Sequence, residues 1–213
     1  MRTDYRKVVA QLLLQIKAIK LNAKNPFTWA SGIKSPIYCD NRIALSHTHA
    51  RNTIKKALVQ EATEFTSFDV VAGVATAGIP HGALVADTLG LPFVYVRSKT
   101  KGHGRQNKIE GELHEGAKVL VIEDLISTGG SSMEAINALQ EQAVEVVGLL
   151  AIFTYELDFA ATRFGEAKIE LRTLTTYSTL LNVARDLQYV DEEDLELLAE
   201  WRKSPGTWSQ NLK

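Results

Sequence analysis

Several features that would assign the chain to a specialised class of protein are scarce or missing. Its 213 residues include one cysteine, Cys39, so the chain cannot build an internal disulfide framework, and a reducing compartment is expected. No apolar run reaches the roughly 18 residues that a membrane-spanning helix needs. The formal net charge is −1, so no bulk attraction to nucleic acid or to a membrane surface is expected.

The rest of the composition is typical of an ordinary globular protein. Hydrophobic residues make up 45% of the chain and charged residues 23%, which predicts one domain spanning residues 1–213. The N-terminal segment is interspersed with charges and has no small-residue cleavage site after an apolar block. It is therefore not expected to be a secretory signal, and a cytoplasmic location is predicted.

Apolar runs that suit strands alternate with helical patterns over most of the chain. The expected strands cover residues 69–74, 92–97, 118–123, 144–155 and 169–173, with a short extended piece at 37–39. The expected helices cover residues 4–19, 47–65, 79–89, 131–142, 177–184 and 191–201. Near-continuous apolar strands need cover on both faces. The alternation therefore predicts an α/β fold with a central, mainly parallel sheet flanked by helices.

Residues 119–131, VLVIEDLISTGGS, are the most informative part of the chain. An apolar strand is expected to end at two acids, Glu123 and Asp124, and a turn rich in hydroxyl groups and glycine leads into a helix. Such a turn offers backbone N–H groups and the positive end of a helix dipole to a phosphate, and the acids can accept hydrogen bonds from a diol. A lone acidic pair is more often a solvated strand end. Joined to this turn, it favours a phosphorylated sugar.

Residues 97–111, RSKTKGHGRQNKIEG, form a polar and basic stretch with almost no apolar anchor. Its ordinary interpretation is a solvated surface loop. Ligands of parallel sheets bind beyond the carboxyl ends of the strands, so this stretch, the turn at 75–78 and the acids at 123–124 should share one edge. Beside a phosphate site, a basic stretch of this length predicts a lid that neutralises a leaving group and excludes water.

Four segments together resemble a known family. VLVIEDLISTGGS resembles the signature with which type I phosphoribosyltransferases bind phosphoribosyl pyrophosphate (PRPP), and GVATAGIPHGALVA (73–86) resembles their pyrophosphate-binding turn. The basic stretch, with Arg97, Lys101, His103, Gly104 and Gly111, is similar to the lid of the orotate phosphoribosyltransferases within that family. FTWASGIKSPIY (27–38) resembles their N-terminal hood, which should be built largely from residues 20–42, with the mobile lid at 98–114. The resemblance covers about residues 20–155.

The resemblance implies transfer of the phosphoribosyl group to orotate, with orotidine 5′-monophosphate and pyrophosphate as products. Implied PRPP-binding residues are Arg97, Lys101, His103, Glu123, Asp124, Leu125, Ile126, Ser127, Thr128, Gly129, Gly130, Ser131, Thr76, Ala77 and Gly78. Among the named residues, Lys101, His103 and Asp124 are implied in catalysis, and Ser127 and Lys34 in orotate binding. Mg²⁺ is expected as a cofactor held mainly by substrate oxygens, without a dedicated protein metal site. A homodimer, in which the lid serves the neighbouring site, is also implied.

The chain departs from the family pattern around the base. Ala30 stands where many orotate enzymes have a lysine, and Thr76-Ala77 where many have an aromatic–lysine pair. No clear arginine follows the strand at 144–155. Candidates to replace these contacts are Lys34, Asp40, Asn41 and Arg42, although a structural role for Arg42 is as plausible. Two alternatives stay open: a phosphoribosyltransferase acting on a purine base, and a regulator that senses PRPP without catalysis.

Overall fold

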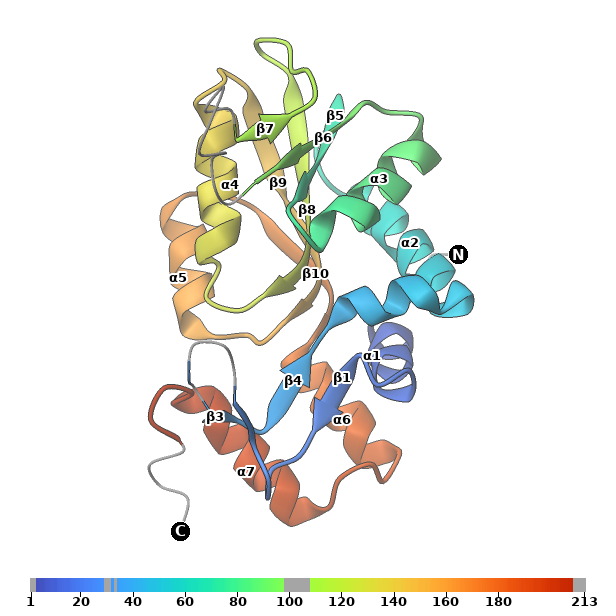
Figure 1. Ribbon diagram of the computed structural model, residues 1–213, viewed down its shortest axis with the longest axis vertical. Helices are drawn as coiled ribbons and strands as arrows, with labels where there is room; N and C mark the ends of the chain where they lie inside the picture. Colours follow the sequence, from blue (N-terminus) through green and yellow to red (C-terminus); the bar gives the residue numbers. More distant parts are fainter. Residues whose placement is uncertain (1–2, 29–31, 33, 98–107, 209–213) are drawn as a thin grey trace.

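A six-stranded sheet forms the centre of the molecule (Figure 1). The computed structural model describes residues 3–28, 32, 34–97 and 108–208. The strand order is β10-β9-β8-β5-β6-β7, and all neighbours are parallel except the edge pair β6 and β7. The strands span β5 Val70–Val74, β6 Phe93–Val96, β7 Ile109–Glu110, β8 Lys118–Ile126, β9 Glu145–Thr154 and β10 Leu171–Thr176.

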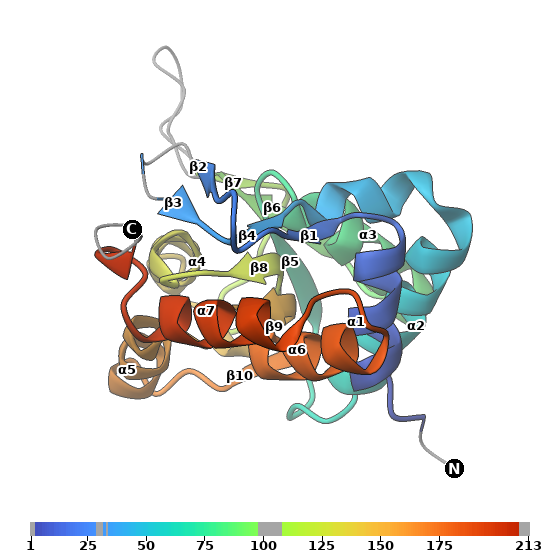
Figure 2. The same cartoon turned by 90° about the horizontal axis from the view of Figure 1, so that it is seen from below.

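Helices cover both faces of the sheet, which explains the continuous apolar strands. Along β8, Leu120 and Ile122 join one core cluster, while Val119 and Val121 join the cluster on the opposite face. The first face is covered by α1 Arg6–Gln15, α2 Thr48–Ala62, α3 Gly78–Leu89, α6 Tyr177–Asp186 and α7 Glu192–Lys203. The second is covered by α4 Gly130–Gln140 and α5 Asp158–Glu166, which lie across the sheet from α1, α2 and α3 (Figure 2).

A small substructure, here called the hood, lies at the end of the molecule near α6 and α7 (Figure 1). It consists of two antiparallel pairs, β1 Ile19–Leu21 with β4 Ile37–Cys39, and β2 Phe27–Thr28 with β3 Lys34–Ser35. The 3-10 helix η1, Asn41–Ser46, then connects it to α2. Buried Asn41 donates from Nδ2 to the backbone oxygen of Asp124 at 2.7 Å, so the hood is fastened to the end of β8.

The predicted α/β class and parallel sheet are confirmed, but some local predictions are wrong and one helix was missed. β8 does not end at Glu123, because Leu125 and Ile126 still pair with Phe153 and Thr154 of β9. The first helix ends at Gln15 instead of Ile19, where β1 begins. The helix α5 was not predicted, because it buries two side chains, Ala160 and Phe164, and two apolar positions give little helical periodicity. Among the described residues, no helix is long and apolar enough to cross a membrane.

Candidate functional site

A cavity of about 310 Å³ opens where β8 ends and α4 begins. It brings together segments that are some fifty residues apart, as predicted for the carboxyl edge of a parallel sheet. Its wall consists of Ala75, Thr76, Ala77, Glu123, Asp124, Leu125, Ser127, Thr128, Gly129, Gly130, Ser131 and Ser132. Most of the predicted PRPP-binding residues therefore meet in one place. Buried Ile126 and Gly78 lie beside the wall and do not form part of it.

The turn from β8 into α4, residues 127–131, is shaped to expose backbone N–H groups. Gly129 has a φ of +73°, in the left-handed region, and a Cβ there would lie 2.8 Å from Phe164. Glycine is therefore required both by the backbone conformation and by the close packing of α5. The first N–H groups of α4 have no carbonyl partner within the helix. They lie at its N-terminus, which is the positive end of the helix dipole and faces the cavity. This arrangement suits a phosphate.

Side chains alternate along a strand, so Glu123 leans toward α4 and Asp124 toward the hood, yet the two carboxyl groups stay close enough to share a hydrogen bond. Glu123 is 5% exposed and reaches toward α4: its Oε1 accepts from the Asp124 N–H at 3.0 Å, and its Oε2 accepts from Ser132 Oγ at 3.3 Å. Burial, and then the nearby charge of Asp124, hold the pKa of Glu123 well above its ordinary value. Burial also raises the pKa of Asp124, on the hood side, although the hydrogen bond with Glu123 and, more weakly, the charge of Arg42 oppose this.

The turn after β5 forms another part of the cavity wall. Its Ala75–Thr76 peptide is cis, and α3 begins two residues later at Gly78. A Cβ on Gly78 would lie 2.5 Å from the backbone oxygen of Ile122, so glycine lets α3 approach β8 closely. This close approach brings Thr76 and Ala77 into the wall of the same cavity as the two acids.

The remaining predicted residues lie away from this wall or outside the described part of the chain. Arg97 follows β6 at the same sheet edge, and its Nη1 lies 3.3 Å from Glu110 Oε1. Lys34 is exposed on β3 of the hood. Lys101 and His103, together with Ala30, fall outside the described residues.

Of the residues considered for the base, three have structural partners: Asp40, Asn41 and Arg42. Asn41 is fully buried; its Nδ2 donates to the Asp124 backbone, and its Oδ1 lies 3.5 Å from Cys39 Sγ. Arg42 forms a two-point ion pair with Asp40, at 2.7 Å from Nε to Oδ1 and 2.9 Å from Nη2 to Oδ2. Asn41 therefore acts as a clamp between the hood and β8, and Arg42 is held by Asp40.

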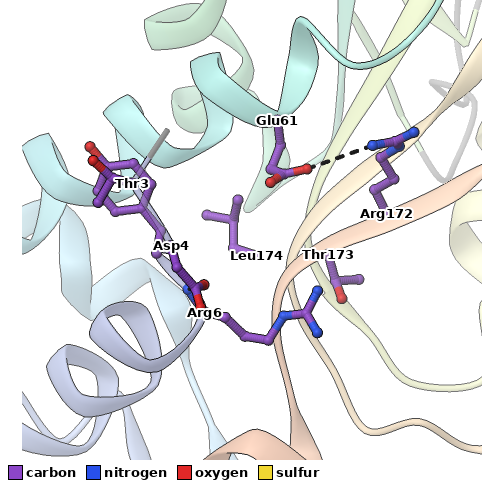
Figure 3. A pocket seen from close by; sticks show the side chains of 8 residues that line it. Thr3, Asp4, Arg6, Glu61, Arg172, Thr173 and Leu174 are labelled. Atoms are coloured by element: carbon purple, nitrogen blue, oxygen red, sulfur yellow. Dashed lines mark hydrogen bonds and ion pairs between the residues drawn. The ribbon is translucent and has the colours of Figure 1, made fainter. Parts of the chain in front are cut away.

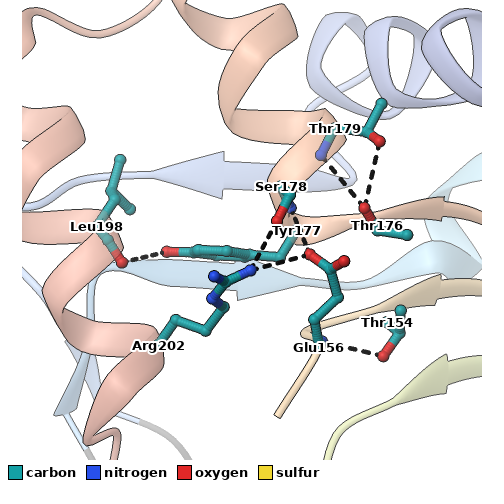
Figure 4. Close-up of polar contacts among 8 residues, drawn as sticks. All are labelled: Thr154, Glu156, Thr176, Tyr177, Ser178, Thr179, Leu198 and Arg202. Atoms are coloured by element: carbon teal, nitrogen blue, oxygen red, sulfur yellow. Dashed lines mark hydrogen bonds and ion pairs between the residues drawn. The ribbon is translucent and has the colours of Figure 1, made fainter.

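At the end of β9, where the family pattern favours an arginine, the chain has Glu156 with a φ of +54°. Its Oε2 accepts from the Ser178 N–H at 2.7 Å and from Arg202 Nη1 at 3.2 Å (Figure 4). The same Arg202 nitrogen donates to Ser178 Oγ at 2.6 Å. An arginine thus does reach this strand end, but it comes from α7 and is occupied by Glu156.

A larger cavity, of about 530 Å³, lies between the segment before α1, the end of α2 and β10 (Figure 3). Two arginines line it, Arg6 and Arg172, and Arg172 Nε lies 2.6 Å from Glu170 and its Nη1 3.9 Å from Glu61. Its guanidinium also sits 5.2 Å from the centre of the Phe65 ring. Because the wall of this larger cavity has no glycine turn that could present backbone N–H groups to a phosphate, the smaller cavity is the better candidate for a sugar phosphate.

Comparison with known proteins agrees with this assignment. Residues 45–166 match the family described as the phosphoribosyl transferase domain. The chain is 52% identical over 209 residues to an orotate phosphoribosyltransferase of Enterococcus faecalis, covering 98% of this chain and 100% of that protein. It is 55% identical over 205 residues to the enzyme of that name from Listeria innocua, covering 96% and 98%.

Solved structures give the same result for the fold. Orotate phosphoribosyltransferase from Aeropyrum pernix is 26% identical with a TM-score of 0.74, covering 86% of this chain and 99% of that one. The enzyme from Mycobacterium tuberculosis in complex with PRPP is 26% identical with a TM-score of 0.65, covering 83% and 98%. An adenine phosphoribosyltransferase from Leishmania tarentolae, at 18% identity and a TM-score of 0.61 over 82% and 90%, shares the fold alone.

Proposed function

This chain belongs to the orotate phosphoribosyltransferases, a branch of the phosphoribosyltransferase family, and we propose that it transfers the 5-phosphoribosyl group from PRPP to orotate. The products are orotidine 5′-monophosphate and pyrophosphate, in a step of pyrimidine nucleotide synthesis. The observation that carries the proposal is full-length identity above one half to enzymes of that name, 52% and 55%. The glycine turn and acidic pair of the cavity supply matching chemistry.

In this proposal the turn holds the 5-phosphate and the acids hold the ribose. Backbone N–H groups of residues 128–131 face the phosphate, as at other helix N-termini. Glu123 and Asp124 accept hydrogen bonds from the ribose hydroxyl groups. When a ring nitrogen of orotate attacks the anomeric carbon, the bond to pyrophosphate breaks and the sugar becomes positively charged. The negative charge of Asp124 then stabilises this positively charged sugar more strongly than it stabilises the neutral sugar of bound PRPP.

The leaving pyrophosphate is assigned to the turn at 76–78 and to the basic stretch that begins at Arg97. Lys101 and His103 would neutralise its charge as the bond breaks. The carboxylates of Glu123 and Asp124 are hard oxygen donors, a set that suits Mg²⁺ alongside substrate oxygens. When bound, Mg²⁺ neutralises negative charge on the pyrophosphate.

Ser127 and Lys34 are the residues proposed to contact orotate. Ser127 lines the cavity between the acids and the phosphate turn, so it can reach both ribose and base. Lys34 offers a positive charge from the hood to the orotate carboxylate. A purine-base enzyme is the nearest alternative, and the lid and hood sequences favour orotate over it. A cytoplasmic setting is part of the proposal, and the single cysteine supports it.

Replacement of Lys101 tests catalysis against PRPP sensing. The wild type should form orotidine 5′-monophosphate and pyrophosphate in equal amounts. In Lys101→Ala, we expect kcat to fall about 100-fold, because a charge that stabilises the leaving group is lost. Binding of PRPP, measured by calorimetry without orotate, should persist. Unchanged turnover would contradict the role of the lid, and absence of turnover by the wild type would contradict the enzyme itself.

Mixing two inactive variants tests the proposed homodimer. If the lid of one subunit completes the neighbour's site, a heterodimer of Lys101→Ala and Glu123→Gln contains one intact site. Random exchange of equal amounts should then restore about a quarter of the wild-type activity, since half of the dimers are mixed and each has one working site. No recovery after verified subunit exchange would show that each lid serves its own subunit.

A further inference from the structure

An arginine outside the predicted site touches the turn that holds the phosphate. Arg163 lies in the last turn of α5, and its Nη1 donates to the backbone oxygen of Thr128 at 2.6 Å. A Cβ on Gly130 would lie 3.3 Å from the same nitrogen, so the guanidinium rests against the turn itself. Neither residue 163 nor its helix was singled out by the sequence patterns.

This contact fixes the direction of one peptide plane. In a planar trans peptide, the C=O of one residue and the N–H of the next point in opposite directions. Because the Thr128 carbonyl faces Arg163, the N–H of Gly129 points away from α5, and Gly129 lines the cavity. Phe164, the next residue of α5, packs where a Gly129 Cβ would be. Two neighbouring side chains of α5 therefore hold the turn in its anion-binding conformation.

The charge of Arg163 also matters at this place. Of the described residues that line the cavity, none is basic, and Glu123 and Asp124 add negative charge. A phosphate bound there gains from any positive charge close to the turn. Arg163 places a guanidinium on the outer side of the same peptide whose N–H faces the cavity. Since the side chain is exposed, its contribution should be modest and sensitive to salt.

We propose that Arg163 is a positioning residue for the 5-phosphate of the donor: it orients the Thr128–Gly129 peptide and adds positive charge behind the phosphate-binding turn. The inference rests on the proposed function, because it assigns the turn to the 5-phosphate. It assigns no part of the pyrophosphate or base site to Arg163.

Calorimetry with two phosphate ligands separates this role from a general loss of structure. In Arg163→Met, the Kd of ribose 5-phosphate should rise about tenfold, the equivalent of one lost charge-assisted hydrogen bond. The Kd of magnesium pyrophosphate should stay within about twofold, because that ligand is assigned to the other turn. Arg163→Lys keeps the charge and one donor, so it should recover most of the affinity. Arg185→Met, which removes an exposed arginine from the last turn of α6, is the matched control.

The outcomes distinguish this inference from the function on which it rests. Ribose 5-phosphate affinity in Arg163→Met equal to that of Arg185→Met would overturn the inference while leaving orotate turnover by the wild type intact. Equal weakening of both ligands, in Arg163→Lys as well as Arg163→Met, would also overturn it, because a merely structural role predicts that pattern. Failure of the wild type to bind ribose 5-phosphate or to turn over orotate would instead reject the proposed function.

Discussion

Glu123→Gln should lower kcat/KM for PRPP by about 100-fold and at the same time raise the melting temperature at pH 7.5. The loss of activity follows because an amide cannot offer a charged acceptor to the ribose or oppose the positive charge of the sugar. The gain in stability follows because burial penalises the ionised carboxylate. The amide can still accept from the Asp124 N–H and face Ser132, so the local hydrogen bonds can be kept.

The pH dependence of this stability gain has a definite sign. The pKa of Glu123 is raised in the folded state, so its contribution to stability is present below the unfolded pKa and is lost as pH rises through the folded pKa. The melting temperatures of wild type and Glu123→Gln should therefore differ at pH 7.5 and converge toward about pH 4. Calorimetric scans across this range measure it, with Glu141→Gln at the exposed end of α4 as control. A variant that keeps activity within twofold would contradict the assigned role.

Trp201→Ala should be the most destabilising single change in the C-terminal part of the chain. Trp201 is 0% exposed, and its ring lies 5.5 Å from those of both Tyr155 and Tyr177. Removing such a buried aromatic side chain should lower the free energy of unfolding by about 3–5 kcal/mol. For a chain of this length, the melting temperature should fall by about 10 °C. Leu187→Ala, at a side chain that is 47% exposed, should change the free energy by less than about 0.5 kcal/mol.

The packing that makes Trp201→Ala destabilising also indicates the structural role of the last sixty residues. Tyr155 follows β9 directly, next to Glu156, and its ring packs on Trp201 of α7. Tyr177 Oη donates to the Leu198 backbone at 2.9 Å, so α6 and α7 are joined to each other as well (Figure 4). These helices thus brace the carboxyl end of β9 beside the site. Equal melting temperatures for Trp201→Ala and Leu187→Ala would contradict this account.

The sequence predicted the elements that carry their own signal. β8 and β9 are continuous apolar runs buried on both faces, and the turn at 127–131 combines glycine with hydroxyl groups at a helix start. These features are local, so the class of fold and most of the cavity wall could be predicted from the residues. Both acids line the cavity, as the pattern predicted, although the arrangement of their side chains depends on how β8 continues past Glu123 to Ile126.

The misses share a different cause, because they depend on partners far away in the chain. The strands of the hood are two or three residues long and exist through pairings such as Ile19 with Cys39. The clamp from Asn41 to Asp124 joins residues 83 positions apart, and the contact from Arg163 to Thr128 spans 35. The sequence patterns indicated neither of these two contacts, since asparagine and arginine are common on surfaces. No sequence pattern pointed to Arg163, whose helix is short and mostly exposed.

The most direct measurement of the central claim is release of pyrophosphate from PRPP and Mg²⁺ with five bases in parallel: orotate, uracil, hypoxanthine, xanthine and adenine. The wild-type protein should release pyrophosphate rapidly with orotate and form an equal amount of orotidine 5′-monophosphate. The other four bases should support at most about a hundredth of that rate, because they lack the carboxylate that a charged site would recognise. Turnover with a purine base and none with orotate would contradict the account.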